Sequence, residues 1–255
     1  MWYELPPPCI GAPGGASNST VTDAMTTIQL PRRAFLSNLA GGLALLAGAS
    51  VSALARDAEA APTADEIAKR VQAFYDSTKT FRAAFTQTYT MKVQNAKKVS
   101  TGKVTFEKPG KMSWFYDAPN GNRVVSDGTT IRVYEKDNEQ MFETPVKGSQ
   151  YPAALSFLMG QGKLQKDFTL RLLDAAQMKF EGGYVLEGTP KEATPAYQKL
   201  LLYVDAQTNQ VRRALILDAQ GNRNRFDFSA PVVNKPVDPK EFEFTPPPGT
   251  KIIRP

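Results

Sequence analysis

The feature that most constrains the fold is a succession of short strand-like segments separated by turn residues. Apolar and polar residues alternate within these segments, and turn chemistry such as Asp127-Gly128 and Asp218-Ala219-Gln220-Gly221-Asn222 lies between them. The segments span residues 81–89, 99–106, 112–116, 123–126, 130–135, 140–144, 168–174, 184–187, 199–204, 211–218 and 223–230. Many short strands joined by tight turns predict an α+β, mainly β fold with one antiparallel, strongly curved sheet. No longer period repeats along the chain, which argues against a propeller or solenoid.

A helix is predicted to precede the strands. Thr63 is a good N-cap, and Glu66 lies three residues later as its capping-box partner. Ile67, Val71 and Phe74 then recur at helical spacing and form one apolar face, so we expect this helix to run to about residue 77.

A second, unusually apolar helix is predicted between the two groups of strands. Pro152 can open it, and Gly160 and Gly162 can end it. Because it has almost no polar face, it needs covering on more than one side. We therefore expect it to plug or line the open mouth of the curved sheet, through the apolar residues Leu155, Phe157, Leu158 and Met159.

An export signal is predicted over residues 25–60. Arg32-Arg33 precedes a weakly apolar stretch rich in Ala and Gly, and small-residue cleavage patterns follow at Ala53-Leu54-Ala55 and Ala58-Glu59-Ala60. The paired arginines resemble a twin-arginine signal. A transmembrane anchor is the alternative, but the glycines and serines of the stretch make a poor spanning helix.

The remaining boundaries follow from this signal. Met25 is a natural start, so residues 1–24 are interpreted as a disordered upstream extension that contains Cys9, the only cysteine. The domain predicted over residues 61–255 would then hold no cysteine for a lipid anchor or a disulfide. We expect a periplasmic monomer.

Composition excludes several classes of site. The chain has no histidine and 1 cysteine, so imidazole-based nucleophile pairs and the usual zinc and copper sites are ruled out, and no cofactor is predicted. The net charge is +6, but the Lys and Arg residues are scattered, which favours a solvated surface over nucleic-acid binding. A hydrolase that uses two facing carboxyl groups, about 5 to 10 Å apart, stays open.

Four strings, in this order and spacing, resemble the LolA family of periplasmic outer-membrane lipoprotein carriers. They cover essentially the whole chain after residue 63, and no single string is specific alone. The strings are Phe81-Arg82-Ala83-Ala84-Phe85-Thr86-Gln87, Gly102-Lys103-Val104-Thr105-Phe106-Glu107-Lys108-Pro109 with Trp114 and Tyr116, Ser126-Asp127-Gly128-Thr129-Thr130 before Tyr134, and Phe242-Glu243-Phe244-Thr245-Pro246-Pro247-Pro248-Gly249-Thr250.

The resemblance implies an incomplete β-barrel closed by short helices over an apolar cavity. Such carriers are not enzymes. They take acylated lipoproteins from an ABC transporter in the inner membrane and pass them to a receptor at the outer membrane. The candidate cavity walls are Phe85, Phe106, Met112 and Trp114, and the candidate lid residues are those of the apolar helix.

This sequence departs from the family pattern at two positions. Where the family carries an arginine that closes the lid, this chain has Lys108, which keeps the charge but loses the planar fork of donors. An aromatic position two residues before the tryptophan is Met112, which is apolar but more pliable. We expect weaker or differently arranged lid closure.

Two other functions are compatible with the sequence. One is a periplasmic lipid- or glycolipid-binding protein, or a lipoprotein sensor, with the same half-barrel. The other is the carboxylate-based hydrolase described above.

Overall fold

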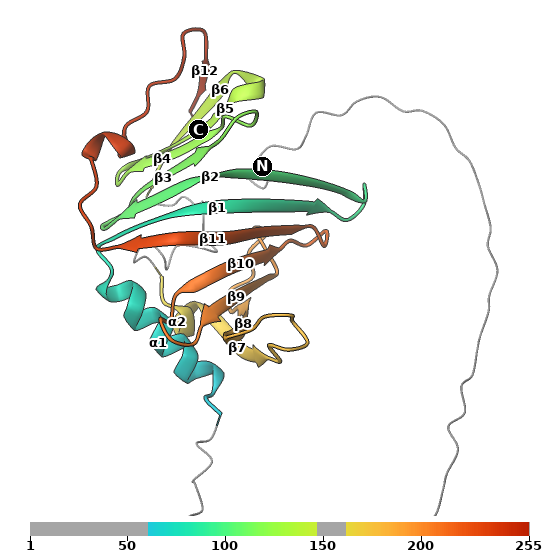
Figure 1. Ribbon diagram of the computed structural model, residues 1–255. Coiled ribbons are helices and arrows are strands. Elements are labelled where there is room, and N and C mark those ends of the chain that lie inside the picture. The colour runs from blue at the N-terminus through green and yellow to red at the C-terminus, as the bar shows by residue number, and fades with distance from the viewer. Residues whose placement is uncertain (1–60, 147–161, 255) are drawn as a thin grey trace, which may run out of the picture. The chain divides into compact units, whose positions relative to one another are not determined.

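The predicted strand segments form one sheet of 12 strands in the computed structural model (Figure 1). The structure describes residues 61–146 and 162–254, which belong to one compact unit. The predicted upstream extension and export signal lie outside these residues. So does the predicted apolar helix with Leu155, Phe157, Leu158 and Met159.

The order of strands in the sheet is β12-β6-β5-β4-β3-β2-β1-β11-β10-β9-β8-β7. The strands are β1 (Thr80–Met91), β2 (Ala96–Glu107), β3 (Lys111–Tyr116), β4 (Arg123–Asp127), β5 (Thr130–Glu135), β6 (Gln140–Pro145), β7 (Phe168–Leu173), β8 (Gly183–Pro190), β9 (Lys199–Asp205), β10 (Val211–Leu217), β11 (Arg223–Val233) and β12 (Lys251–Ile253). The helices are α1 (Ala64–Ser77), α2 (Leu164–Asp167), η1 (Lys136–Asn138) and η3 (Pro239–Phe242). Within the described residues the sheet is open, with β12 and β7 as its end strands.

Most neighbouring strands are joined by short turns and pair antiparallel, as predicted. β1 and β11 also pair antiparallel, but they are far apart in the sequence, because they are the first and the eleventh strands of the chain (Figure 1). It places Phe85 opposite Phe228 and Gln87 opposite Phe226. One strand group, β2 to β6, therefore continues on one side of β1, and the other, β10 to β7, continues beyond β11.

The prediction of a wholly antiparallel sheet is wrong for the C-terminal strand. β12 pairs parallel with β6, and Lys251 lies opposite Gln140. The reason lies in the topology: both edges of β11 are already occupied by β1 and β10, so the chain leaves the sheet after Val233. It passes through η3 and the proline run and adds its last strand at the free edge of β6.

α1 forms as its capping signals predict. The Thr63 hydroxyl accepts a hydrogen bond from the Glu66 amide, and the Glu66 carboxylate accepts one from the Thr63 amide, at 3.2 and 2.8 Å. The buried face of the helix, Ile67, Val71 and Tyr75, joins the main hydrophobic core. α1 thereby packs against α2 and the β7–β8 end of the sheet.

The main core lies on one face of the sheet, which we call the core face. Alternation along each strand directs apolar side chains to this face, including Phe85, Trp114 and Leu202. A smaller cluster around Phe180 and Tyr203 covers the opposite face of β8 and β9. Burial of one face across so many strands is the main source of stability for a sheet of this kind.

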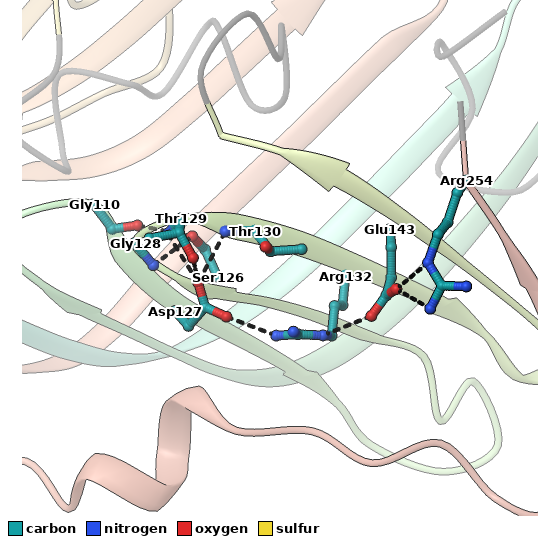
Figure 2. Close-up of polar contacts among 9 residues, drawn as sticks. All are labelled: Gly110, Ser126, Asp127, Gly128, Thr129, Thr130, Arg132, Glu143 and Arg254. Carbon is teal, nitrogen blue, oxygen red and sulfur yellow. Dashed lines mark hydrogen bonds and ion pairs between the residues drawn. The ribbon is translucent and has the colours of Figure 1, made fainter.

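Charged side chains form a network around β4, β5 and β6 (Figure 2). The Asp127 carboxylate accepts hydrogen bonds from the Thr129 and Thr130 amides, each at 2.8 Å, and pairs with Arg132 at 2.9 Å. Arg132 also contacts Glu143, at 3.0 Å, and Glu143 in turn pairs with Arg254 beyond β12. The network therefore links the β4–β5 turn to the C-terminal strand.

The Asp127 carboxyl makes the stability of this turn dependent on pH. Burial works to raise its pKa, but the hydrogen bonds from Thr129, Thr130 and Arg132 outweigh burial and hold the pKa well below the ordinary 3.8. A lowered folded-state pKa contributes stability above the unfolded pKa, and this stability is lost as the pH falls through the folded value.

We therefore expect Asp127→Ala to lower the free energy of unfolding by about 1–3 kcal/mol at pH 7. The loss relative to the parent should shrink as the pH is lowered below 3.8. Denaturant titrations at several pH values measure this. Asp137→Ala, at an exposed position in η1, is the matched control and should change stability by less than about 0.5 kcal/mol. A pH-independent loss for Asp127→Ala would contradict the assigned role.

Candidate functional site

The four predicted cavity residues lie together on the core face. Phe85, Phe106 and Trp114 are each 2% exposed, and Met112 is fully buried. They belong to three adjacent strands, β1, β2 and β3, and Phe106 lies directly opposite Met112 in the β2–β3 register. Alternation within each strand, together with the β1–β2 and β2–β3 registers, brings these side chains to one face.

Aromatic rings from β1, β2, β3 and β11 make one connected group. We call its phenylalanine and tryptophan members the aromatic cluster: Phe81, Phe85, Phe106, Trp114, Phe226 and Phe228. The rings of Tyr75 and Tyr116 adjoin it at Phe81 and Phe85. The Trp114 ring is at its centre, with centroid distances of 5.1 Å to Phe85, 5.2 Å to Phe226 and 5.9 Å to Phe106. Tilted and edge-to-face pairs at these distances contribute about 0.5–1.5 kcal/mol each beyond area burial.

Three members of the aromatic cluster were not among the predicted site residues. Phe226 and Phe228 lie two apart in a predicted strand, which signals one shared face. The sequence did not say that this strand pairs with β1, and only that pairing carries the two rings to Trp114. Phe81 lies in the first recognised string and belongs to the same face as Phe85.

Gly102 makes room for the ring of Phe85. The two residues are opposite in the β1–β2 register, and a Cβ atom on Gly102 would lie 2.7 Å from Cζ of Phe85 and would overlap the Phe115 carbonyl oxygen. The ring therefore lies across the glycine, a known way to cover a glycine in a strand. The absence of a side chain here is part of how the aromatic cluster fits together.

The predicted lid-closing residue, Lys108, lies between β2 and β3 and reaches α1. Its Nζ donates a hydrogen bond to the Tyr75 carbonyl oxygen in the last turn of the helix. Partial burial lowers the Lys108 pKa, while Asp76 works to raise it. A cation at the C-terminal end of a helix is favourable, so Lys108 ties the β2–β3 turn to α1.

The described carboxyl groups with a shifted pKa are held by hydrogen bonds and ion pairs. Six described carboxyl groups have a shifted pKa, and every shift is downward. Glu187 is typical: burial works to raise its pKa, but Arg171 and Lys199 outweigh it. A general acid at neutral pH needs the opposite direction.

The described residues offer neither a metal site nor a membrane-spanning helix. In residues 61–146 and 162–254, no group of three or more His, Cys, Asp and Glu residues is arranged to hold a metal ion. The helices in that part of the chain also include none that is long and apolar enough to span a bilayer.

A groove of about 620 Å³ lies on the face opposite the aromatic cluster. Its lining residues come from β1 to β4, from β11, and from η3 and the two residues after it. Phe115, Arg123 and Phe244 are among them. The Arg123 guanidinium stacks 3.3 Å from the centre of the Phe115 ring. None of these three residues was among the predicted site residues, because the groove depends on where the chain runs after β11.

The comparisons with known proteins place this mainly-β, single-sheet protein in one family. The family model described as outer membrane lipoprotein carrier protein LolA matches residues 76–245. The outer-membrane lipoprotein carrier protein of Methylibium petroleiphilum is 31% identical, covering 72% of this chain and 87% of that protein. The protein with the same description from Nitrosospira multiformis is 27% identical, covering 72% and 86%.

Among solved structures, a LolA superfamily protein from Nitrosomonas europaea aligns with 72% of this chain and 99% of its own, at 15% identity and a TM-score of 0.40. The assignment rests on the sequence matches, because the family model spans well over half of the chain. The chain belongs to the LolA family.

Because Gly102 accommodates the Phe85 ring, we expect Gly102→Ala to lower the free energy of unfolding by about 1–3 kcal/mol. The added methyl group should also displace the ring and alter the near-ultraviolet circular dichroism of the aromatic cluster. Lys103→Ala, the exposed next residue on the same strand, is the control and should leave both measurements nearly unchanged. Equal effects of the two substitutions would contradict the packing described here.

Proposed function

We propose that this protein is a soluble periplasmic carrier, which binds the acyl chains of lipoproteins released from the inner membrane and delivers them to the outer membrane. The observation that carries the proposal is the aromatic cluster on the core face of an open sheet, in a member of the LolA family. The relatives that share the family are themselves described as outer-membrane lipoprotein carrier proteins.

The proposed binding site is an apolar cavity on the core face. In this proposal the sheet curls into an incomplete barrel, with Phe85, Phe106, Met112 and Trp114 as walls. α1 and the apolar segment with Leu155, Phe157, Leu158 and Met159 would cover its mouth. Burial of an acyl chain yields about 0.8 kcal/mol per methylene, so a long chain is held without any covalent chemistry.

Lys108 is proposed to control how readily the cavity opens. Its hydrogen bond to the last turn of α1 joins the turn after β2, the strand that carries Phe106, to a helix whose buried face is part of the main core. A single ammonium makes this link without the bidentate geometry that an arginine would offer. Opening is therefore expected to need less free energy than with arginine at this position.

The proposed partners follow from the carrier role. Cargo would come from a lipoprotein-releasing ABC transporter in the inner membrane and would pass to a lipoprotein receptor at the outer membrane. We propose that the carrier acts as a monomer, without a cofactor and without nucleic acid. A catalytic role is not part of the proposal, since the shifted carboxyl groups that the structure describes are ion-paired or hydrogen-bonded with lowered pKa.

The direct test is to isolate the protein from the periplasm and identify what it carries by mass spectrometry. Acylated lipoproteins would support the carrier role. Free phospholipid or glycolipid as the bound species would favour the related lipid-binding function. Protein that is always empty, and that releases no lipoproteins when added to spheroplasts, would refute the proposal.

Lys108→Leu should change cargo transfer more than it changes stability. Losing the link to α1 should cost about 1 kcal/mol of stability, while opening of the cavity becomes easier and transfer to an acceptor several-fold faster. Lys108→Arg should slow transfer, because a forked donor strengthens the link. Transfer rates to acceptor membranes and thermal unfolding measure the two effects.

Lys111→Leu, in the same turn region but paired with Glu107, is the control. Unchanged transfer in both Lys108 variants would exclude the proposed role.

A further inference from the structure

One polar atom in the aromatic cluster has no partner. Within residues 61–146 and 162–254, the indole Nε1 of Trp114 is buried without a hydrogen-bond partner, and Trp114 as a whole is 2% exposed. Tryptophan can only donate through this atom, so no alternative protonation state relieves the mismatch. Buried indole N–H groups usually find an acceptor, and one that has none calls for an explanation.

The surroundings of Trp114 explain why the part of the chain that the structure describes supplies no partner. Its ring neighbours are phenylalanines, which carry no oxygen or nitrogen acceptor in their side chains. An aromatic face is only a weak acceptor for an N–H group. In the strand register, Trp114 lies opposite Val104 on β2 and Val124 on β4, which are also apolar.

The position of this donor limits what could satisfy it. A plain hydrocarbon chain that entered among these rings would leave the N–H unpaired. An acyl chain differs from a hydrocarbon at one place, the carbonyl group of its ester or amide linkage, and that oxygen is a good acceptor. A hydrogen bond from the Trp114 N–H to this carbonyl would remove the desolvation penalty of the unpaired N–H, which the protein bears when no ligand is bound.

We infer that the indole N–H of Trp114 donates a hydrogen bond to the linkage carbonyl of a bound acyl chain, and so selects ester- or amide-linked chains over ether-linked or plain hydrocarbon chains. The inference rests on the proposed function and adds to it a residue that sets specificity. Apolar contacts with the aromatic cluster supply affinity for any long chain. The Trp114 N–H distinguishes chains that have a linkage carbonyl from chains that lack one.

A site built to pair with a polar group rejects analogues that lack it, because its own buried group is then left unsatisfied. The Trp114 N–H, which lies among apolar rings, should therefore disfavour chains without a linkage carbonyl. It also accounts for a tryptophan at the centre of the cluster, where a phenylalanine would fill much of the same apolar space and leave no unpaired atom.

The test compares two probes that differ only in the linkage carbonyls: a synthetic peptide with a diacylglyceryl cysteine, and its dialkyl ether analogue of equal chain length. We expect the parent protein to bind the ester probe about 5- to 30-fold more tightly, the range for one satisfied buried donor. In Trp114→Phe the two affinities should become equal, mainly through weaker binding of the ester probe.

Phe226→Leu is the matched control, because it alters a ring 5.2 Å from Trp114 and keeps the N–H. It should weaken both probes and preserve their ratio. Equal binding of ester and ether by the parent, or a ratio that survives in Trp114→Phe, would overturn the inference while the carrier function stands. Binding of neither probe by the parent would overturn the proposed function, and this inference with it.

A second measurement on the parent protein covers the case in which Trp114→Phe does not fold. Trp114 is the one tryptophan of the domain predicted over residues 61–255, so the periplasmic protein should give a single indole N–H signal. The Trp114 resonance should move downfield with the ester probe and much less with the ether probe. The same shift with both probes would refute the hydrogen bond.

Discussion

The pairing of β1 with β11 is the contact on which the rest of the structure depends. It joins two strands that are distant in sequence and unites the β2–β6 group with the β10–β7 group in one sheet. Closing so long a loop is entropically unfavourable, and the cost is offset where the pairing brings Phe226 and Phe228 against Phe85 and Trp114. Sheet continuity and the aromatic cluster are therefore two consequences of one register.

Apolar and charged side chains occupy different parts of the sheet. In the described part of the chain, the strands contribute apolar side chains to the core face, and the Trp114 indole N–H is a buried donor there without a partner. On β4 to β6, charged side chains link the Asp127 turn to Arg254, and this network secures the last strand at the sheet edge. Polar groups are thus satisfied where they stabilise the strands. The exception lies inside the aromatic cluster, where a ligand is proposed to bind.

Much of the fold and part of the site follow from local patterns. Alternation and turn residues marked the strand segments, capping signals marked α1, and Phe85, Phe106 and Trp114 were named as candidate cavity walls. The parallel pairing of β12 did not follow, because it depends on which edge of the sheet is free. The contribution of Phe226 was missed for a similar reason, since a strand's sequence indicates its face but not its neighbour.

The sequence by itself determined the class of the protein: a mainly β domain of the LolA family, with a candidate apolar site and no histidine for nucleophilic chemistry. These properties reside in residue type and local spacing, which need no knowledge of distant contacts. Only the tertiary structure decided that Lys108 reaches the Tyr75 carbonyl of α1, and that the Trp114 indole has no partner. Both are facts about neighbours, and neighbours are set by the packing of segments far apart in the chain.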